Sequence, residues 1–199
     1  MTCSPQSNPG YLNFPVHRTA EPRTLVTMAR KLHLGGTVRT VGWEVFNALP
    51  GDHVDHQGNA SDLSRFASGT FDELYGSHIV EHFDYKDELQ ATLKEWHRVL
   101  APGGLLYVSV PDLDTLCGLI LDRRMTPTQR FHVMRMLFGG HVDQWDYHQV
   151  GLNQEFLSSF LQNAGFSGIQ RVREFGLFSD TSSMVFAGTP ISLNLIAYK

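Results

Sequence analysis

The sequence predicts a single α/β domain built on a mostly parallel sheet of about seven strands. Between Phe71 and Pro111 the chain reads as a strand, an amphipathic helix and a second strand. Short apolar runs on both sides of this stretch alternate with glycine turns and helical patterns, as expected for an α/β fold. The length of 199 residues suits one domain, which would bury roughly 70 % of its unfolded surface.

The helix of the central stretch is defined by its apolar spacing and by its end. Pro102-Gly103-Gly104 cannot continue a helix, so we expect it to end near Ala101. The residues that recur at helical spacing are Leu89, Leu93, Trp96 and Leu100.

The strand that follows, Leu105 to Val110, is a nearly unbroken apolar run. Such a run is typical of a parallel strand covered on both faces. Ligands of open α/β sheets bind beyond the carboxyl ends of the strands. Ser77-His78 and Pro111-Asp112 should therefore face one crevice.

The remaining strands are shorter. We expect them at 31–34, 43–46, 54–57, 169–175 and 193–198, with Gly35-Gly36 forming a turn after the first. Only six residues separate Gly36 from Trp43, whereas a helical crossover between parallel strands needs about a dozen. Either an extended link replaces the first helix, or these strands pair differently.

Helices are expected at 113–121, 131–138 and 153–163, the last closed by Gly165. Residues 1–28, rich in Pro, Ser, Asn and Thr, read as an irregular arm. The domain would then span 29–199, with a helical lid inserted at about 114–150 over the crevice. The apolar segment 175–186 is interpreted as either a homodimer contact or part of this lid.

The composition of the chain limits the classes of binding partner and the cellular location that we expect. The net charge of −4 gives no electrostatic footprint for nucleic acid. No apolar run approaches the ~18 residues that span a bilayer, and the first residues lack the blocks of a signal peptide. Cys3 and Cys117 form no metal-binding pattern. We therefore expect a cytoplasmic protein with no membrane span, no nucleic-acid partner and no metal.

The segment EWHRVLAPGGLLYVSVPD, at 95–112, resembles a segment of small type 11 predicted methyltransferases. LHLGG at 32–36 is similar to their glycine-rich motif, and GWEVFNA at 42–48 to their second-strand motif. The resemblance covers roughly 31–199. It implies the Rossmann-like fold of a class I methyltransferase, with S-adenosylmethionine as cofactor and a small-molecule or glycan hydroxyl as methyl acceptor.

The resemblance also implies where the cofactor binds. Glycine turns let backbone N–H groups approach a ligand carboxylate closely. The ribose position, acidic in the family, falls on Asn47, with Glu44 as a substitute. The cofactor-binding residues implied are Gly35, Gly36, Glu44, Asn47, Asn59, Ala60, Ser77 and His78.

The candidate catalytic residues come mostly from histidines. The family's similar DYHK-G segment matches Asp146 to Gly151 and makes His148 the first candidate for the proton acceptor, since a neutral imidazole suits that task near pH 7. Asp112 is the second candidate. The resemblance places His78 beside the sulfonium and the acceptor, while His82 orients the turn or the lid.

Two other functions remain open at this point. The shortened glycine motif and Asn47 would also suit a protein that binds the cofactor without catalysis. His78, Glu81 and His82 form H-x-x-E-H, the pattern of an inverted zincin, in which two histidines one helical turn apart bind zinc. That zinc hydrolase requires a full helix under the motif and a distant third ligand.

Overall fold

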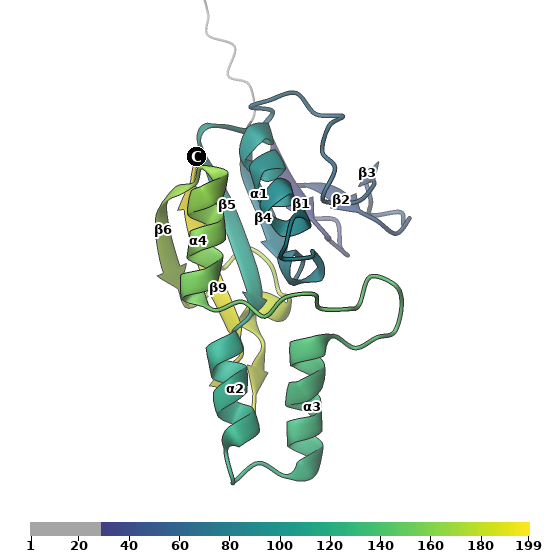
Figure 1. Cartoon of the computed structure of the whole chain (residues 1–199). Helices are drawn as coiled ribbons and strands as arrows, with labels where there is room; N and C mark the ends of the chain where they lie inside the picture. Colours follow the sequence, from purple (N-terminus) through teal and green to yellow (C-terminus); the bar gives the residue numbers. More distant parts are fainter. Residues whose placement is uncertain (1–28) are drawn as a thin grey trace, which may run out of the picture.

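The computed structural model describes residues 29–199, and the arm expected at 1–28 lies outside the described residues. Its centre is a seven-stranded sheet in the order β3-β2-β1-β4-β5-β9-β6 (Figure 1). The strands are β1 (Lys31–Leu34), β2 (Glu44–Asn47), β3 (His56–Gln57), β4 (Phe71–Ser77), β5 (Leu100–Pro111), β6 (Ser167–Val172) and β9 (Ser192–Tyr198); β7 (Val185–Phe186) and β8 (Thr189–Pro190) form a separate hairpin.

The sheet is mostly parallel, as predicted. The pairs β1–β2, β2–β3, β1–β4 and β4–β5 are parallel, and β9 runs antiparallel to both of its neighbours. β1 pairs directly with β2 although no helix lies between them. The extended link is therefore the correct alternative for the first crossover.

Four helices and two 3-10 turns complete the described chain. They are α1 (Glu88–Val99), α2 (Leu113–Leu121), α3 (Pro127–Phe138), α4 (Gln154–Ala164), η1 (Val80–His82) and η2 (Thr181–Ser183). Several expected boundaries are shifted: α3 begins at Pro127 instead of 131, and β6 spans 167–172 instead of 169–175. β5 begins at Leu100, directly after α1, because the Pro102–Gly104 segment that stops the helix already belongs to the strand. The third strand is only two residues long.

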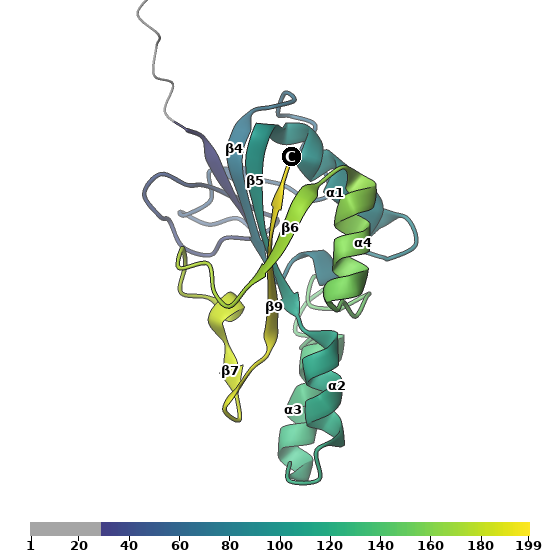
Figure 2. The same cartoon turned by 90° about the vertical axis from the view of Figure 1, so that its left-hand side faces the viewer.

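The main core lies between the sheet and one layer of helices. α1 and α4 both lie on the same face of the sheet (Figure 2). Trp96 is the largest fully buried side chain, and its ring lies against the backbone of β4 at Gly76, where a Cβ would come within 3.0 Å of it. This close approach places the α1 layer directly over β4, whose carboxyl end carries the Ser77-His78 turn.

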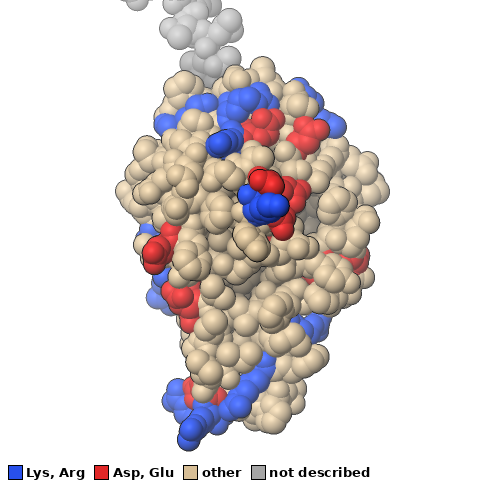
Figure 3. Space-filling model, viewed as in Figure 1, with Lys and Arg blue, Asp and Glu red and all other residues tan. Residues whose placement is uncertain are grey.

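α2 and α3 form a hairpin that projects beyond the carboxyl ends of the strands (Figure 1). Thr126 begins α3 with a capping box, in which its hydroxyl accepts from Gln129 N and the Gln129 side chain accepts from Thr126 N. Basic side chains gather at the tip of this hairpin, while charges of both signs are interspersed over the rest of the same face (Figure 3). In the described part of the chain, every helix is too short or too polar to cross a membrane.

The opposite face of the sheet carries the segment 173–184 (Figure 2). Phe178 of this segment packs on His33 of β1 and Tyr75 of β4, with ring centroids 4.2 and 4.4 Å apart. Tyr75 Oη donates to the Asp180 carboxylate at 2.8 Å. Part of the apolar 175–186 segment is thus used within the domain, while Met184 and Val185 remain exposed.

His33 makes the stability of this aromatic cluster pH-dependent. Burial lowers the pKa of His33 from 6.5 to about 4, with Asp180 opposing the shift. Its folded pKa lies below its unfolded value, so stability is fully present above pH 6.5 and is lost as the pH falls toward 4.

We predict that the free energy of unfolding of the wild-type protein falls by about 3 kcal/mol between pH 7 and 4 because of His33, and that His33→Phe lacks this part of the fall. Urea unfolding of both proteins between pH 4 and 7 measures the two free energies. An equal fall in both proteins would contradict the prediction.

Candidate functional site

The candidate site begins where the strand order reverses direction, between β1 and β4. The two strands are paired in register from Lys31–Glu73 to Leu34–Gly76, so the turns that follow them lie side by side. Gly35 follows β1 with φ +71° and donates its N–H to Phe46 O at 2.7 Å. A Cβ on Gly35 would collide with Ile79 Cδ1, which comes from the turn after β4. Only glycine fits here without strain.

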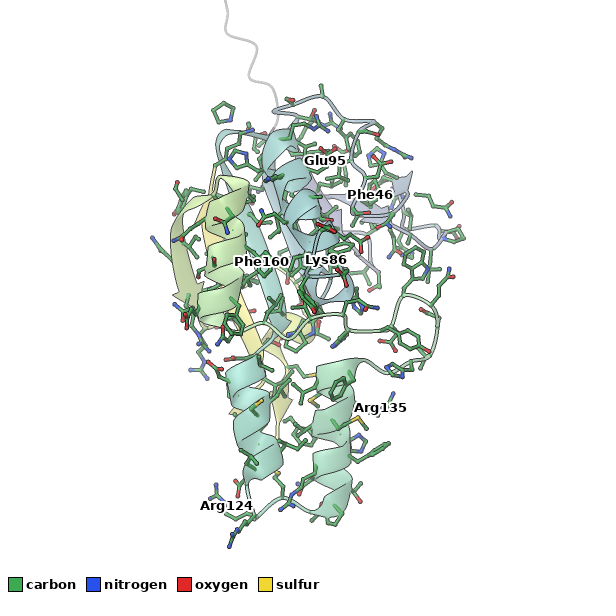
Figure 4. The ribbon with its side chains drawn as sticks, viewed as in Figure 1. Phe46, Lys86, Glu95, Arg124, Arg135 and Phe160 are labelled. Atoms are coloured by element: carbon green, nitrogen blue, oxygen red, sulfur yellow. The ribbon has the colours of Figure 1, made fainter. Side chains whose placement is uncertain are left out.

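A cavity of about 180 Å³ lies against these turns. It is bounded by the carboxyl ends of β1, β2, β3 and β4, as expected for an open α/β sheet. Phe46, labelled in Figure 4, forms part of its apolar wall. The lining residues are Gly35, Phe46, Asn47, Ala48, Leu49, Gly58, Asn59, Ala60, Ile79, His82, Phe83 and Trp145.

The structure separates the two residues considered for the ribose contact. Asn47 lines the cavity, donates to Gly36 O at 2.9 Å and accepts from Leu49 N at 2.9 Å. It braces the glycine turn and keeps one N–H and one lone pair for a hydroxyl. Glu44 lies at the opposite end of β2, where its carboxylate binds Arg30 and His56. The expectation that Glu44 takes over the ribose contact is therefore wrong.

Of the other residues expected at the cofactor, Asn59 and Ala60 line the cavity. Trp96 Nε1 donates to Ala60 O at 2.8 Å, which fixes this loop to α1. Gly36 packs against His33 and Val45, so its lack of a side chain serves packing beneath the turn. Ser77 bonds Thr181 Oγ1 at 3.2 Å and is not among the lining residues.

A second cavity, of about 280 Å³, lies beyond β4 and β5 and under α3. It is more polar than the first and carries cationic and hydroxyl groups as well as imidazoles. Arg135, labelled in Figure 4, reaches it from α3. The lining residues are His78, Pro111, His132, Arg135, Met136, Gly139, Gly140, Asp146, His148, Thr181, Met184 and Ile191.

The turn after β4 stands between the two cavities. His78 faces the second cavity, and Ile79 and His82 face the first. His78 has φ +54°, an uncommon conformation for a residue with a side chain, and its ring is held by Ser192 Oγ at 3.0 Å from Nε2. This strained backbone lets consecutive side chains serve different cavities.

Burial governs the charge of this turn. The pKa of His78 falls to about 4, chiefly because the ring is desolvated and secondarily because His148 is near. Desolvation and then His82 likewise lower the pKa of His148 to about 4. Desolvation raises the pKa of Glu81 to about 8. Near pH 7, His78 and His148 are therefore neutral, and Glu81 is largely protonated.

Asp112 does not join this group. Its carboxylate binds Arg171 at 2.8 Å and Thr115 Oγ1 at 3.0 Å, at the start of α2, and it lines neither cavity. Because this carboxylate is engaged by an arginine and lies away from both cavities, the structure does not support Asp112 as the base.

The zinc hydrolase interpretation fails on backbone geometry. An inverted zincin needs its two histidines one turn apart on an α-helix, whereas here only Val80–His82 form a 3-10 turn and His78 lies outside it with positive φ. His78 and His82 consequently face different cavities.

Comparisons with known proteins agree with this geometry. A family model described as a methyltransferase domain matches residues 44–108. No curated protein sequence matches the chain. Among solved structures, a SAM-dependent methyltransferase from Archaeoglobus fulgidus is 15 % identical with a TM-score of 0.55, and the alignment covers 86 % of each chain.

Two further structures share the fold. An S-adenosylmethionine-dependent methyltransferase from Mesorhizobium loti is 16 % identical with a TM-score of 0.53, over 85 % of this chain and 90 % of the other. The 1,6-didemethyltoxoflavin-N1-methyltransferase of Burkholderia thailandensis, with bound S-adenosylhomocysteine, is 15 % identical with a TM-score of 0.52, over 86 % and 71 %.

The fold and the family match together define the class. The chain carries a methyltransferase domain, matched over residues 44–108, and has the fold of S-adenosylmethionine-dependent methyltransferases. S-adenosylmethionine is its cofactor, and when bound it supplies the methyl electrophile. The glycine cradle at Gly35, the apolar wall around Phe46 and the free amide valences of Asn47 fit that molecule.

We predict that Gly35→Val weakens binding of S-adenosylhomocysteine by at least about tenfold, because its side chain would enter the cavity beside Ile79. Gly42→Val is the matched control, since Gly42 also has positive φ but has open space around it. Calorimetric titration measures both affinities. Equal losses in the two variants would show that backbone strain, not intrusion, is responsible.

Proposed function

We propose that the protein transfers the methyl group to a hydroxyl of a small molecule or glycan held in the second cavity. The observation that carries this proposal is the juxtaposition of two cavities across one turn. Ile79 and His82 face the cofactor side, while the adjacent His78 faces the other. An acceptor in the second cavity would therefore approach the methyl group from across the His78 turn.

The lining of the second cavity suits a hydroxylated acceptor. Arg135 and Thr181 offer hydrogen-bond donors, and Asp146 offers an acceptor. Hydrogen bonds to several hydroxyls would orient such a molecule. The volume of about 280 Å³ is at the small end for ligand pockets, so only the reacting end of a glycan would be enclosed.

His148 is the residue that we assign to receive the acceptor proton. It lines the second cavity, only 11 % of its side chain is exposed, and its pKa near 4 keeps the ring neutral. The acceptor oxygen attacks the methyl carbon in line with the departing sulfur, while its proton passes to the imidazole. Most of the catalysis comes from alignment, with the base contributing about 10²–10⁴-fold.

We predict that wild-type protein transfers labelled methyl groups to hydroxyl compounds in a panel that also contains amines and thiols. His148→Ala should lower kcat by at least about 100-fold, while its affinity for S-adenosylhomocysteine stays within a few-fold of wild type. Label found only on amines or thiols would overturn the hydroxyl assignment. A comparable loss of cofactor affinity would move His148 to the cofactor site.

A further inference from the structure

The carboxyl group of Glu81 is the least satisfied polar group near the two cavities. Its side chain is 1 % exposed, and neither oxygen has a hydrogen-bond partner among the described residues. The nearest imidazole nitrogens are His78 Nδ1 at 3.5 Å and His148 Nε2 at 4.0 Å from Oε1. Leaving a buried carboxyl group unpaired is unfavourable, so this group is suited to bind a ligand.

Backbone contacts bring two imidazole side chains, those of His82 and His148, close to this carboxyl group. Gln149 N donates to Glu81 O at 2.7 Å, which fastens the segment after α3 to η1. His82 Nδ1 lies 3.1 Å from Tyr147 O in the same segment. As a result the rings of His82 and His148 meet edge to face, with centroids 4.9 Å apart.

We propose that Glu81, His82 and His148 bind a divalent transition-metal ion. Each residue offers one ligand atom, and these atoms all lie within 4.8 Å of one another. Bonds of about 2.1 Å in tetrahedral geometry require ligand atoms about 3.4 Å apart. The 4.0 Å between His148 Nε2 and Glu81 Oε1 is already close to this spacing, and small side-chain rotations supply the rest.

The donor set selects the kind of metal. Two imidazoles and one carboxylate suit zinc or iron(II), whereas magnesium and calcium prefer oxygen ligands throughout. Histidines that bind metals usually hydrogen-bond through their other nitrogen to a backbone carbonyl or a carboxylate. His82 already does so: its Nδ1 faces Tyr147 O, which leaves Nε2 for the ion.

An ion at this position would change how the acceptor is activated, and this consequence rests on the proposed function. His82 lines the cofactor cavity and His148 the acceptor cavity, so the ion would lie at their boundary. An acceptor oxygen bound to the ion would lose its proton more readily. That proton would pass to the His78 ring, the oxygen would bond the methyl carbon, and the electrons of the carbon–sulfur bond would remain on sulfur.

In that case His148 acts as a metal ligand and His78 receives the proton. The two accounts of His148 differ in their response to metal. If His148 is only a base, a chelator leaves turnover unchanged. If His148 is a ligand, removing the metal abolishes turnover, and restoring zinc recovers it.

Metal binding itself is tested on the full-length chain without an affinity tag. The protein is stripped with a chelator and dialysed against zinc, and the bound metal is measured by mass spectrometry. We expect one zinc per chain with micromolar or tighter affinity. Glu81→Gln, His82→Ala and His148→Ala should each bind at least about tenfold more weakly. His53→Ala, remote from the cluster, should bind as wild type does.

Binding no stronger in wild type than in Glu81→Gln would overturn the proposal. Cobalt(II) provides a second readout, because visible absorption bands of a four- or five-coordinate ion should appear in wild type and be lost in Glu81→Gln. Failure of the proposed function is distinguishable, since titration with S-adenosylhomocysteine is independent of zinc stoichiometry. If the chain binds zinc through these residues but does not transfer methyl groups to hydroxyls, the metal-site proposal stands and the proposed function is overturned.

Discussion

The parallel pairing of β4 with β1 is the constraint on which the site depends. It sets Gly35 beside the turn after β4, and the contact that a Gly35 side chain would make with Ile79 shows how closely the two turns approach. Trp96 presses α1 onto β4 and also holds the Ala60 loop through its indole N–H. The core and the first cavity are therefore stabilised by the same contacts.

The turn after β4 then separates the two cavities. Positive φ at His78 turns its ring toward the second cavity, and the short 3-10 segment that follows buries Glu81 while His82 reaches the first cavity. The segment after α3 closes over this turn through Gln149 and Tyr147. These contacts bring His148 close to Glu81, so the position of the segment after α3 and the composition of the site are linked.

Local patterns predicted most of the fold, while long-range contacts decided the site. The strand β5 and the helices α1 and α4 follow from periodicity and from glycine and proline, all readable within a few residues. Glu44 was considered for the ribose contact, but it begins β2 and its carboxylate binds Arg30 and His56, two partners that periodicity within the strand does not show. Asp112 was assigned as a base because its partner Arg171 is 59 residues away. Glu81 was noticed only as part of a motif, since burial of its carboxyl depends on segments that meet only in the folded chain.

The central claim is that the cavity at the β1–β4 reversal holds S-adenosylmethionine. Calorimetric titration of the wild-type chain with S-adenosylhomocysteine tests it most directly, because it requires no knowledge of the acceptor. The account predicts saturable binding of one molecule per chain with micromolar or tighter affinity. If a chain shown to be folded gives no binding heat in this titration and S-adenosylmethionine does not compete for the site, the account is contradicted.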